Sequence, residues 1–228
     1  MRKGLRIAVA FGCLLVFAAA AYATVIEDFE DGNISEYTVI GDVTALVTTA
    51  AAHDGTYGLE FRGTDLAEGW IYRNDAQVHL QQGDVISLWA RTMEVPGGYT
   101  RCYCGFGATP SGCYSAVLAP NTSEFLIQLN SGYSYTNLAS VAQSWQLGHW
   151  YKVAIDWQSG GTITAYLYDS DGTTLLNSVT AVDNTFTQGG IAFRSFDSGY
   201  AAYFDTISRE GAVPTQSTSW GSIRALFR

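Results

Sequence analysis

Two neighbouring segments decide the fold: Trp150–Trp157, with the sequence WYKVAIDW, and Thr162–Tyr168, with the sequence TITAYLY. In the first segment, large apolar residues alternate with small or charged ones, as expected of a strand that buries one face. Gly160 and Gly161 separate the two segments, and glycines favour a tight turn between antiparallel strands. The pair therefore predicts a β-hairpin in a half-buried antiparallel sheet.

The same alternation recurs on both sides of this hairpin, from Val25 to Ile207. Turn residues interrupt it about every 8–12 residues, a spacing typical of β-sandwiches and barrels. No stretch of this region holds a helical period, and roughly fourteen short strands are expected from the pattern. The sequence therefore predicts an all-β chain that packs as a two-sheet antiparallel jelly-roll sandwich.

The two ends of the chain differ from this central region. Basic residues at positions 2, 3 and 6 precede the apolar stretch Ile7–Ala21, and Ala21-Tyr22-Ala23 gives a cleavage motif. The apolar stretch is shorter than the roughly 20 residues of a membrane-spanning helix. We therefore expect a signal peptide over 1–23, a jelly-roll domain over 24–211, and a linker with a short C-terminal segment over 212–228. The predicted location is secreted or cell-surface.

The charge of the chain excludes two classes of partner. Removing residues 1–23 takes three of the 12 basic residues and none of the 21 acidic ones, so nine remain and the formal charge becomes −12. Nucleic acids and anionic membranes are bound by clustered cations, which such a chain lacks. No later stretch is long and apolar enough to span a membrane.

Three cysteines follow the expected cleavage site: Cys102, Cys104 and Cys113. This odd number allows at most one intramolecular disulfide. A hairpin centred between Ala108 and Thr109 would place Cys104 opposite Cys113. Because disulfides form outside the cytoplasm, we expect a Cys104–Cys113 bridge and a free Cys102.

Three segments together resemble a known superfamily. Ile26–Gly32, with the sequence IEDFEDG, resembles the opening strand and turn of many bacterial extracellular jelly rolls. Trp150–Trp157 with Thr162–Asp169 is similar to the paired core strands of concanavalin A-like and laminin-G-like domains. Tyr203–Ile207 is similar to their closing strand. The likeness covers about residues 25–210, and the superfamily includes lectins, glucanases, adhesion domains and carbohydrate-binding modules.

The resemblance implies a structural calcium ion between the first and last strands. Glu30 and Asp205 match the two positions whose carboxylates hold the ion, and the turn Gly55–Tyr57 would add carbonyl oxygens. Calcium takes six to eight such oxygen ligands. Asp169 and Asp171 also resemble the start of a calcium loop, but the downstream Glu is missing, so we expect a hairpin turn there.

The superfamily also contains glycoside hydrolases, which use two carboxylates on either side of the scissile bond. The glucanase motifs E-x-D-x-x-E and E-x-D-x-E are absent from the middle strands. Glu27, Asp28 and Glu30 are acidic, but they lie at the first strand with the wrong spacing. We therefore expect no catalytic residues and no enzymatic activity. A glucanase-like hydrolase remains the weaker alternative.

Glycan binding requires aromatic rings on a sheet face beside polar groups. The aromatic and arginine residues that meet this description are Trp70, Tyr72, Trp89, Arg91, Tyr99, Arg101, Tyr103, Tyr133 and Tyr135. The odd positions of Tyr99, Arg101 and Tyr103 share one strand face, and so do those of Tyr133 and Tyr135.

These five residues are the predicted binding site of a non-catalytic module for a glycan or cell-surface polymer. The structural alternative for such aromatics is ordinary cross-strand packing. The functional alternative is a structural or adhesive surface protein that binds other proteins.

Overall fold

The computed structural model describes residues 23–63, 69–93, 101–195 and 201–210. Sixteen β-strands and one short 3-10 turn, Thr49–Ala51, make up these ranges. The expected C-terminal segment and all but one residue of the expected signal peptide lie outside them. Within the described ranges no helix is long and apolar enough to cross a membrane.

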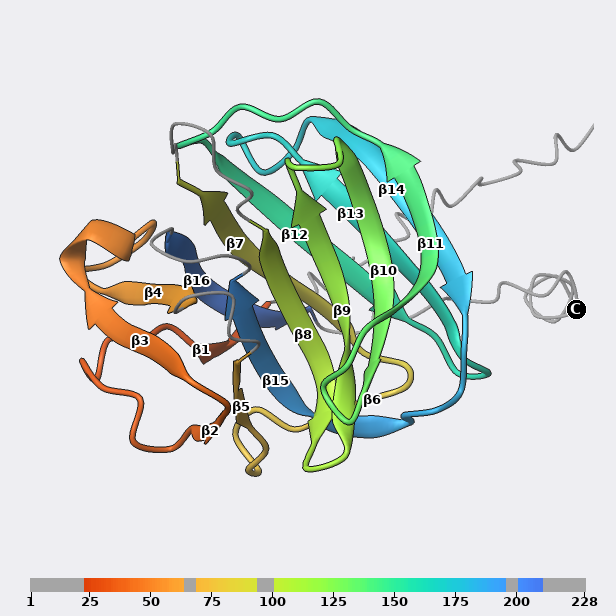
Figure 1. Cartoon of the computed structure of the whole chain (residues 1–228), viewed down its shortest axis with the longest axis horizontal. Coiled ribbons are helices and arrows are strands. Elements are labelled where there is room, and N and C mark those ends of the chain that lie inside the picture. Colours follow the sequence, from red (N-terminus) through yellow and green to blue (C-terminus); the bar gives the residue numbers. More distant parts are fainter. Residues whose placement is uncertain (1–22, 64–68, 94–100, 196–200, 211–228) are drawn as a thin grey trace, which may run out of the picture.

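The strands form two antiparallel sheets of eight strands each, which confirms the predicted all-β jelly-roll sandwich (Figure 1). The first, named the β7 sheet, runs in the order β14 (Leu175–Val182), β13 (Thr162–Tyr168), β12 (Trp150–Trp157), β7 (Val85–Thr92), β16 (Ala201–Glu210), β4 (Gly58–Gly63) and β3 (Val43–Thr48), with β1 (Thr24–Glu27) paired to β16. The second, named the β8 sheet, runs in the order β11 (Thr136–Ala142), β10 (Glu124–Ser131), β9 (Gly112–Ala119), β8 (Cys102–Thr109), β15 (Gln188–Ser195), β5 (Trp70–Arg73) and β2 (Thr38–Ile40), with β6 (Leu80–Gln81) paired to β15.

The predicted hairpin is present as β12 and β13. Val153 lies opposite Leu167 and Ile155 lies opposite Ala165 in an unbroken antiparallel register. The burial of both strands alternates residue by residue, so that one face packs inward and the other faces outward. At the far edges of the two sheets, β11 and β14 contact each other and run side by side (Figure 1).

The core lies between the two sheets and is rich in aromatic rings. Trp157 packs edge-to-face against Phe106 at 5.4 Å and against Tyr114 at 6.1 Å between ring centroids. Gly107 adopts φ 62°, and a Cβ there would lie 2.8 Å from the Trp157 ring. Only glycine allows both this backbone conformation and this close approach.

The predicted Cys104–Cys113 disulfide is wrong, because the β8–β9 hairpin turns later than expected. Cys104 pairs with Ala116, and an irregularity between Phe106 and Thr109 shifts the register near the turn. Cys104 packs in the core between the sheets, whereas Cys113 packs with Trp70 on the outer face of the β8 sheet. Two side chains on opposite faces of a sheet cannot be bridged, and Cys102, Cys104 and Cys113 are all free.

Candidate functional site

An aromatic cluster covers part of the outer face of the β8 sheet. The ring of Trp70 on β5 lies 5.4 Å from that of Tyr103 on β8 and 5.5 Å from that of Tyr133. Tyr72 extends the cluster, with its ring centroid 5.8 Å from that of Tyr133. Strand alternation explains the placement, because Trp70 and Tyr72 point outward while Ile71 between them points into the core.

Tyr133 joins this cluster from a turn and not from a strand. The sequence pattern predicts a strand over 133–138, but β11 begins only at Thr136. Tyr133 adopts φ 63°, which directs its ring back over the sheet, and its hydroxyl donates to the carbonyl oxygen of Thr109 at 2.8 Å. Two of the predicted binding residues, Tyr103 and Tyr133, therefore meet through Trp70, a contact that their own spacing does not predict.

The cluster is largely closed to ligands at its Tyr103 end. Tyr103 is 2% exposed, and the guanidinium of Arg194 lies over it at 4.9 Å from the ring centroid. Arg101 donates from Nε to Oδ1 of Asn121 at 2.7 Å. Tyr135 is 57% exposed, and Tyr99 lies outside the described residues. Of the predicted binding residues, Tyr103 is therefore a packing residue of this cluster. The accessible ring of the cluster is that of Tyr72, which is half-buried.

The Tyr72 ring opens onto a depression of about 250 Å³, named the Tyr72 depression. It is lined by the aromatic ring, hydroxyl, amide and carboxylate groups of Glu36, Thr38, Tyr72, Asn74 and Asp75, together with Pro110. An aromatic face bordered by short polar side chains matches the surface of a sugar, which has an apolar C–H face and hydroxyls at its edges.

Asp75 is the most firmly positioned polar group of this depression. Its Oδ2 atom accepts from Nε of Arg73 at 2.5 Å, and its Oδ1 atom accepts from the backbone N–H of Gln77 at 2.8 Å. Burial raises the pKa of the Asp75 carboxyl, but these hydrogen bonds outweigh it and keep the pKa below its usual value. Asp75 is therefore a charged hydrogen-bond acceptor.

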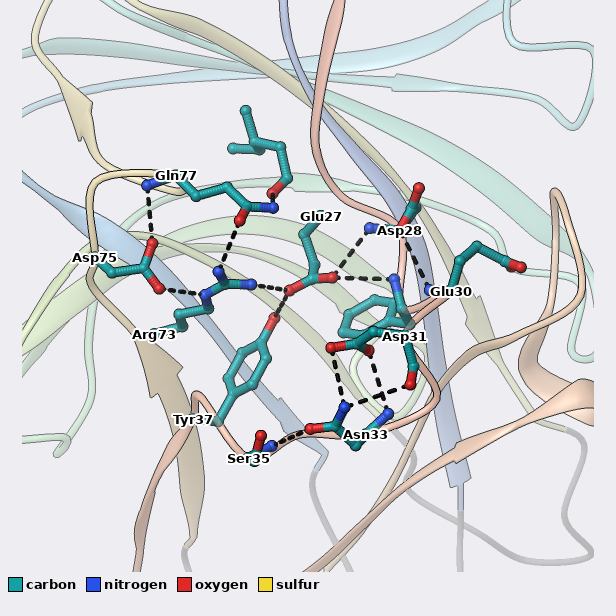
Figure 2. Close-up of polar contacts among 12 residues, drawn as sticks. Glu27, Asp28, Glu30, Asp31, Asn33, Ser35, Tyr37, Arg73, Asp75 and Gln77 are labelled. Atoms are coloured by element: carbon teal, nitrogen blue, oxygen red, sulfur yellow. Dashed lines mark hydrogen bonds and ion pairs between the residues drawn. The ribbon is translucent and has the colours of Figure 1, made fainter.

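A buried network behind the depression holds Arg73 in place (Figure 2). Nη1 of Arg73 lies 2.8 Å from Oε2 of Glu27, which also accepts the Tyr37 hydroxyl at 2.9 Å. Gln77 accepts from Nη2 of Arg73 and donates to the carbonyl of Ile26. Sequence reasoning missed this network because Glu27 and Arg73 are 46 residues apart and no local pattern connects them.

Glu30 and Asp205, the predicted metal ligands, hold the same loop, 53–57, through its backbone. Oδ2 of Asp205 accepts the N–H groups of His53 and Asp54 at 2.6 and 2.9 Å. Oε1 of Glu30 accepts those of Thr56 and Tyr57 at 2.7 and 2.8 Å. Figure 2 shows Glu30 pointing away from the Glu27 network. Both carboxylates therefore contact backbone N–H groups of this loop, whereas the prediction had the loop supply carbonyl oxygens to an ion.

These two carboxylates differ in their burial and in the direction of their pKa shifts. Asp205 is fully buried; burial raises the pKa of its carboxyl, although four hydrogen bonds oppose the shift. The backbone N–H groups of Tyr57 and Thr56 lower the pKa of the more exposed Glu30. A cavity of about 180 Å³ beside β1, β16 and loop 53–57 is lined by Asp28, Glu30 and Asp54 along with Val25, Gly55 and Thr206.

The backbone beside both carboxylates is strained. Phe29 adopts φ 58° and Thr206 adopts φ 44°, values that side-chain-bearing residues rarely take. No three His, Cys, Asp or Glu side chains of the described ranges stand close enough to form a metal centre. The backbone groups that contact both carboxylates are N–H donors.

Comparisons with protein families and with curated proteins found no match. Similar solved structures exist, at low sequence identity. The carbohydrate-binding module CBM66 of Bacillus subtilis matches with a TM-score of 0.58 and 13% identity, over 78% of this chain and 98% of that one. The CBM2 module of the evolved Dit protein of Lactobacillus casei BL23 phage J-1 matches with a TM-score of 0.53 and 12% identity, over 84% and 96%.

A third similar structure is an enzyme. The family 16 endo-glucanase of Bacteroides ovatus matches with a TM-score of 0.52 and 14% identity, over 80% of this chain and 98% of that one. At such identities the likeness establishes the fold alone, since one fold hosts many functions. The chain therefore shares the jelly-roll sandwich fold of these two carbohydrate-binding modules and of the endo-glucanase.

Proposed function

We propose that the protein is a non-catalytic, glycan-binding protein that works outside the cell, and that the Tyr72 depression holds a sugar unit. The observation that carries this proposal is the half-buried Tyr72 ring, supported from behind by Tyr133 and bordered by the charged acceptor Asp75. A ring held by packing loses little freedom when a sugar stacks on it. The expected signal peptide supports a location outside the cell.

The chemistry of the depression supports binding without catalysis. Glycoside hydrolases need a carboxylic acid whose raised pKa keeps a proton available for the leaving group. The pKa of Asp75 is lowered, and Arg73 holds one of its oxygens. Asp75 is therefore suited to accept hydrogen bonds from sugar hydroxyls and unsuited to deliver a proton.

A glycan array probed with the wild type, Tyr72→Ala and Tyr135→Ala tests this proposal. We expect Tyr72→Ala to weaken binding about tenfold, since stacking on an aromatic ring contributes about 1 kcal/mol or more. Tyr135 is the matched control, because this exposed tyrosine in the β10–β11 turn does not line the depression. Its loss should leave binding unchanged. Absence of any bound glycan, or equal binding by Tyr72→Ala, would refute the site, and glycan turnover would refute the non-catalytic role.

We further propose that a calcium ion binds beside Glu30 and Asp205. Three observations support it: the buried Asp205 carboxylate without a basic partner among the described side chains, the cavity lined by Asp28, Glu30 and Asp54, and the strained backbone at Phe29 and Thr206. A buried anion is costly unless a positive charge lies near it. The ion would supply that charge and tie β1, β16 and loop 53–57 together.

Thermal unfolding with and without calcium tests this second proposal. At a hundredfold excess over the Kd, calcium should stabilise the fold by about 2.7 kcal/mol and raise the Tm on the order of 5–10 °C. EDTA should remove the effect, and Asp205→Asn should abolish the response. Asp171→Asn is the control, because it removes a turn carboxylate elsewhere and should keep the response. A wild-type melting curve that calcium and EDTA leave unchanged would exclude the ion.

A further inference from the structure

The outer face of the β7 sheet carries an arginine held between two aromatic rings. Arg91 on β7 lies opposite Trp150 on β12 and opposite Tyr203 on β16. The central carbon of its guanidinium lies 5.1 Å from the Trp150 ring centroid and 4.7 Å from the Tyr203 ring centroid. The rings contact the guanidinium by cation–π interaction and do not use its N–H groups, so the terminal Nη groups are the ones that a ligand could bind.

Arg91 differs from the other basic residues of this face. Arg62 forms an ion pair with Glu60, and Nζ of Lys152 lies 3.9 Å from Oε1 of Glu210. In the part of the chain that the structure describes, no carboxylate pairs with Arg91, and its buried Nε has no hydrogen-bond partner. The chain has a formal charge of −9, so acidic side chains are abundant. An arginine that has no carboxylate partner presents a positive charge to an external anion.

Two further rings adjoin Arg91 on the same face. Trp89 lies two residues before it, and His53 stacks on Trp89 at 3.8 Å between centroids with an interplanar angle of 15°. His53 also meets Trp150 edge-on at 5.2 Å. Trp89 and Trp150 are half-buried, so part of each ring remains accessible. Aromatic rings beside a guanidinium can stack on a sugar ring while the guanidinium binds its acidic substituent.

We propose that Arg91, Trp89 and Trp150 form a second glycan site that binds the carboxylate of a uronic acid. This inference rests on the proposed glycan binding and adds a ligand class on the opposite sheet. The N–H edge of an arginine matches a carboxylate with two parallel hydrogen bonds, which a neutral sugar cannot form. Trp89 and Trp150 provide the surface for the sugar ring.

Polygalacturonate and its fully methyl-esterified form are the matched probes, because they differ only in whether the carboxylate is charged. By isothermal titration, wild-type protein should bind the acidic polymer at least tenfold more tightly than the ester. Arg91→Gln should weaken binding of the acidic polymer about ten- to hundredfold. Arg62→Gln removes the same charge from the same face and should stay within about twofold. Arg91→Lys, which keeps the charge and loses the paired hydrogen bonds, should fall between wild type and Arg91→Gln.

Circular dichroism melting of each variant shows that it is folded. Equal affinity for polymer and ester, or unchanged binding by Arg91→Gln, would overturn the proposal. Poly-glutamate binding as tightly as polygalacturonate would also overturn it, because the partner would then be an acidic peptide. Tyr72→Ala should retain polygalacturonate binding. If the wild type binds polygalacturonate but no neutral glycan, that result counts against the Tyr72 depression and leaves the Arg91 site standing.

Discussion

At the scale of single residues, Asp171 shows how a turn carboxylate acquires an unusual acidity. Its Oδ1 atom accepts the N–H groups of Thr173 and Thr174 at 2.8 and 2.7 Å, and Oδ2 accepts the Thr174 hydroxyl at 2.5 Å. These bonds favour the charged form and lower the pKa of Asp171 to about 2. Asp171 closes the β13–β14 hairpin, as the Asp-Gly pair predicts, and its hydrogen bonds lie within the turn.

The acidity of Asp171 predicts a pH dependence of stability. Because its pKa in the folded state lies below the usual value for an aspartate, its charge stabilises the fold near neutral pH and the contribution is lost as pH falls toward about 2. The Tm of Asp171→Asn should therefore lie below that of the wild type at pH 6, and the two should converge near pH 2. A Tm difference that stays constant across this range would contradict the assignment, and a carboxyl NMR titration measures the pKa directly.

At the scale of elements, the β8–β9 hairpin determines which face of the sheet each cysteine occupies. Its turn lies at Pro110 and Ser111, so Thr109 pairs with Gly112 and the irregularity behind them sends Cys104 and Cys113 to opposite faces. All three described thiols are buried, and burial raises the pKa of each. A thiol that is covered and protonated is a poor nucleophile.

We therefore expect Cys102, Cys104 and Cys113 to resist a soluble thiol reagent in the native protein. In native buffer at pH 8, a disulfide reagent such as DTNB should modify none of them within the time that it modifies free cysteine completely. In guanidinium chloride all three should react. Peptide mapping of the protein purified without reductant should find no peptide linking positions 104 and 113. Modification of a single thiol in denaturant would show that the other two are bridged.

At the scale of the whole molecule, the Glu27–Arg73 pair joins the two sheets near the start of the domain. Glu27 ends β1 of the β7 sheet and Arg73 ends β5 of the β8 sheet, and both side chains are less than one-tenth exposed. Tyr37 and Gln77 complete this network, and Arg73 also pairs with Asp75 (Figure 2). Removal of Arg73 leaves the buried Glu27 carboxylate without a cation, and removal of Glu27 leaves the buried guanidinium with Asp75 as its remaining anionic partner.

This arrangement predicts strong and coupled losses of stability. Glu27→Gln and Arg73→Met should each lower the free energy of unfolding by about 3–5 kcal/mol, and the double variant should lose less than the sum. Lys152→Met is the control, because both side chains of the Lys152–Glu210 pair are partly exposed and such a pair is expected to contribute about 0–1 kcal/mol. Urea unfolding of the wild type and the four variants measures these losses. Strictly additive losses would show that the two residues act independently.

The strands and the fold class follow from local patterns in the chain. Alternation in Trp150–Trp157 and the glycines after it are enough to predict β12, β13 and their hairpin, because side chains two residues apart share a face in any strand. The first and last strands, with Glu30 and Asp205, also follow from a recognisable sequence pattern. Both residues accept backbone N–H groups of loop 53–57, a contact that the pattern did not predict.

Features that depend on which strands become neighbours could not be predicted in this way. The sequence pattern places Tyr103 on an outward strand face as a predicted binding residue. Trp70 on β5 and Arg194 on β15 lie beside it in the structure and bury it. Glu27 finds Arg73 in the other sheet, and Arg91 meets rings from two further strands. Alternation states which side of a strand a residue occupies, whereas burial and charge pairing depend on strand order and register. Strand order and register form when segments far apart in the sequence pack together. A local pattern does not specify which distant segments will become neighbours.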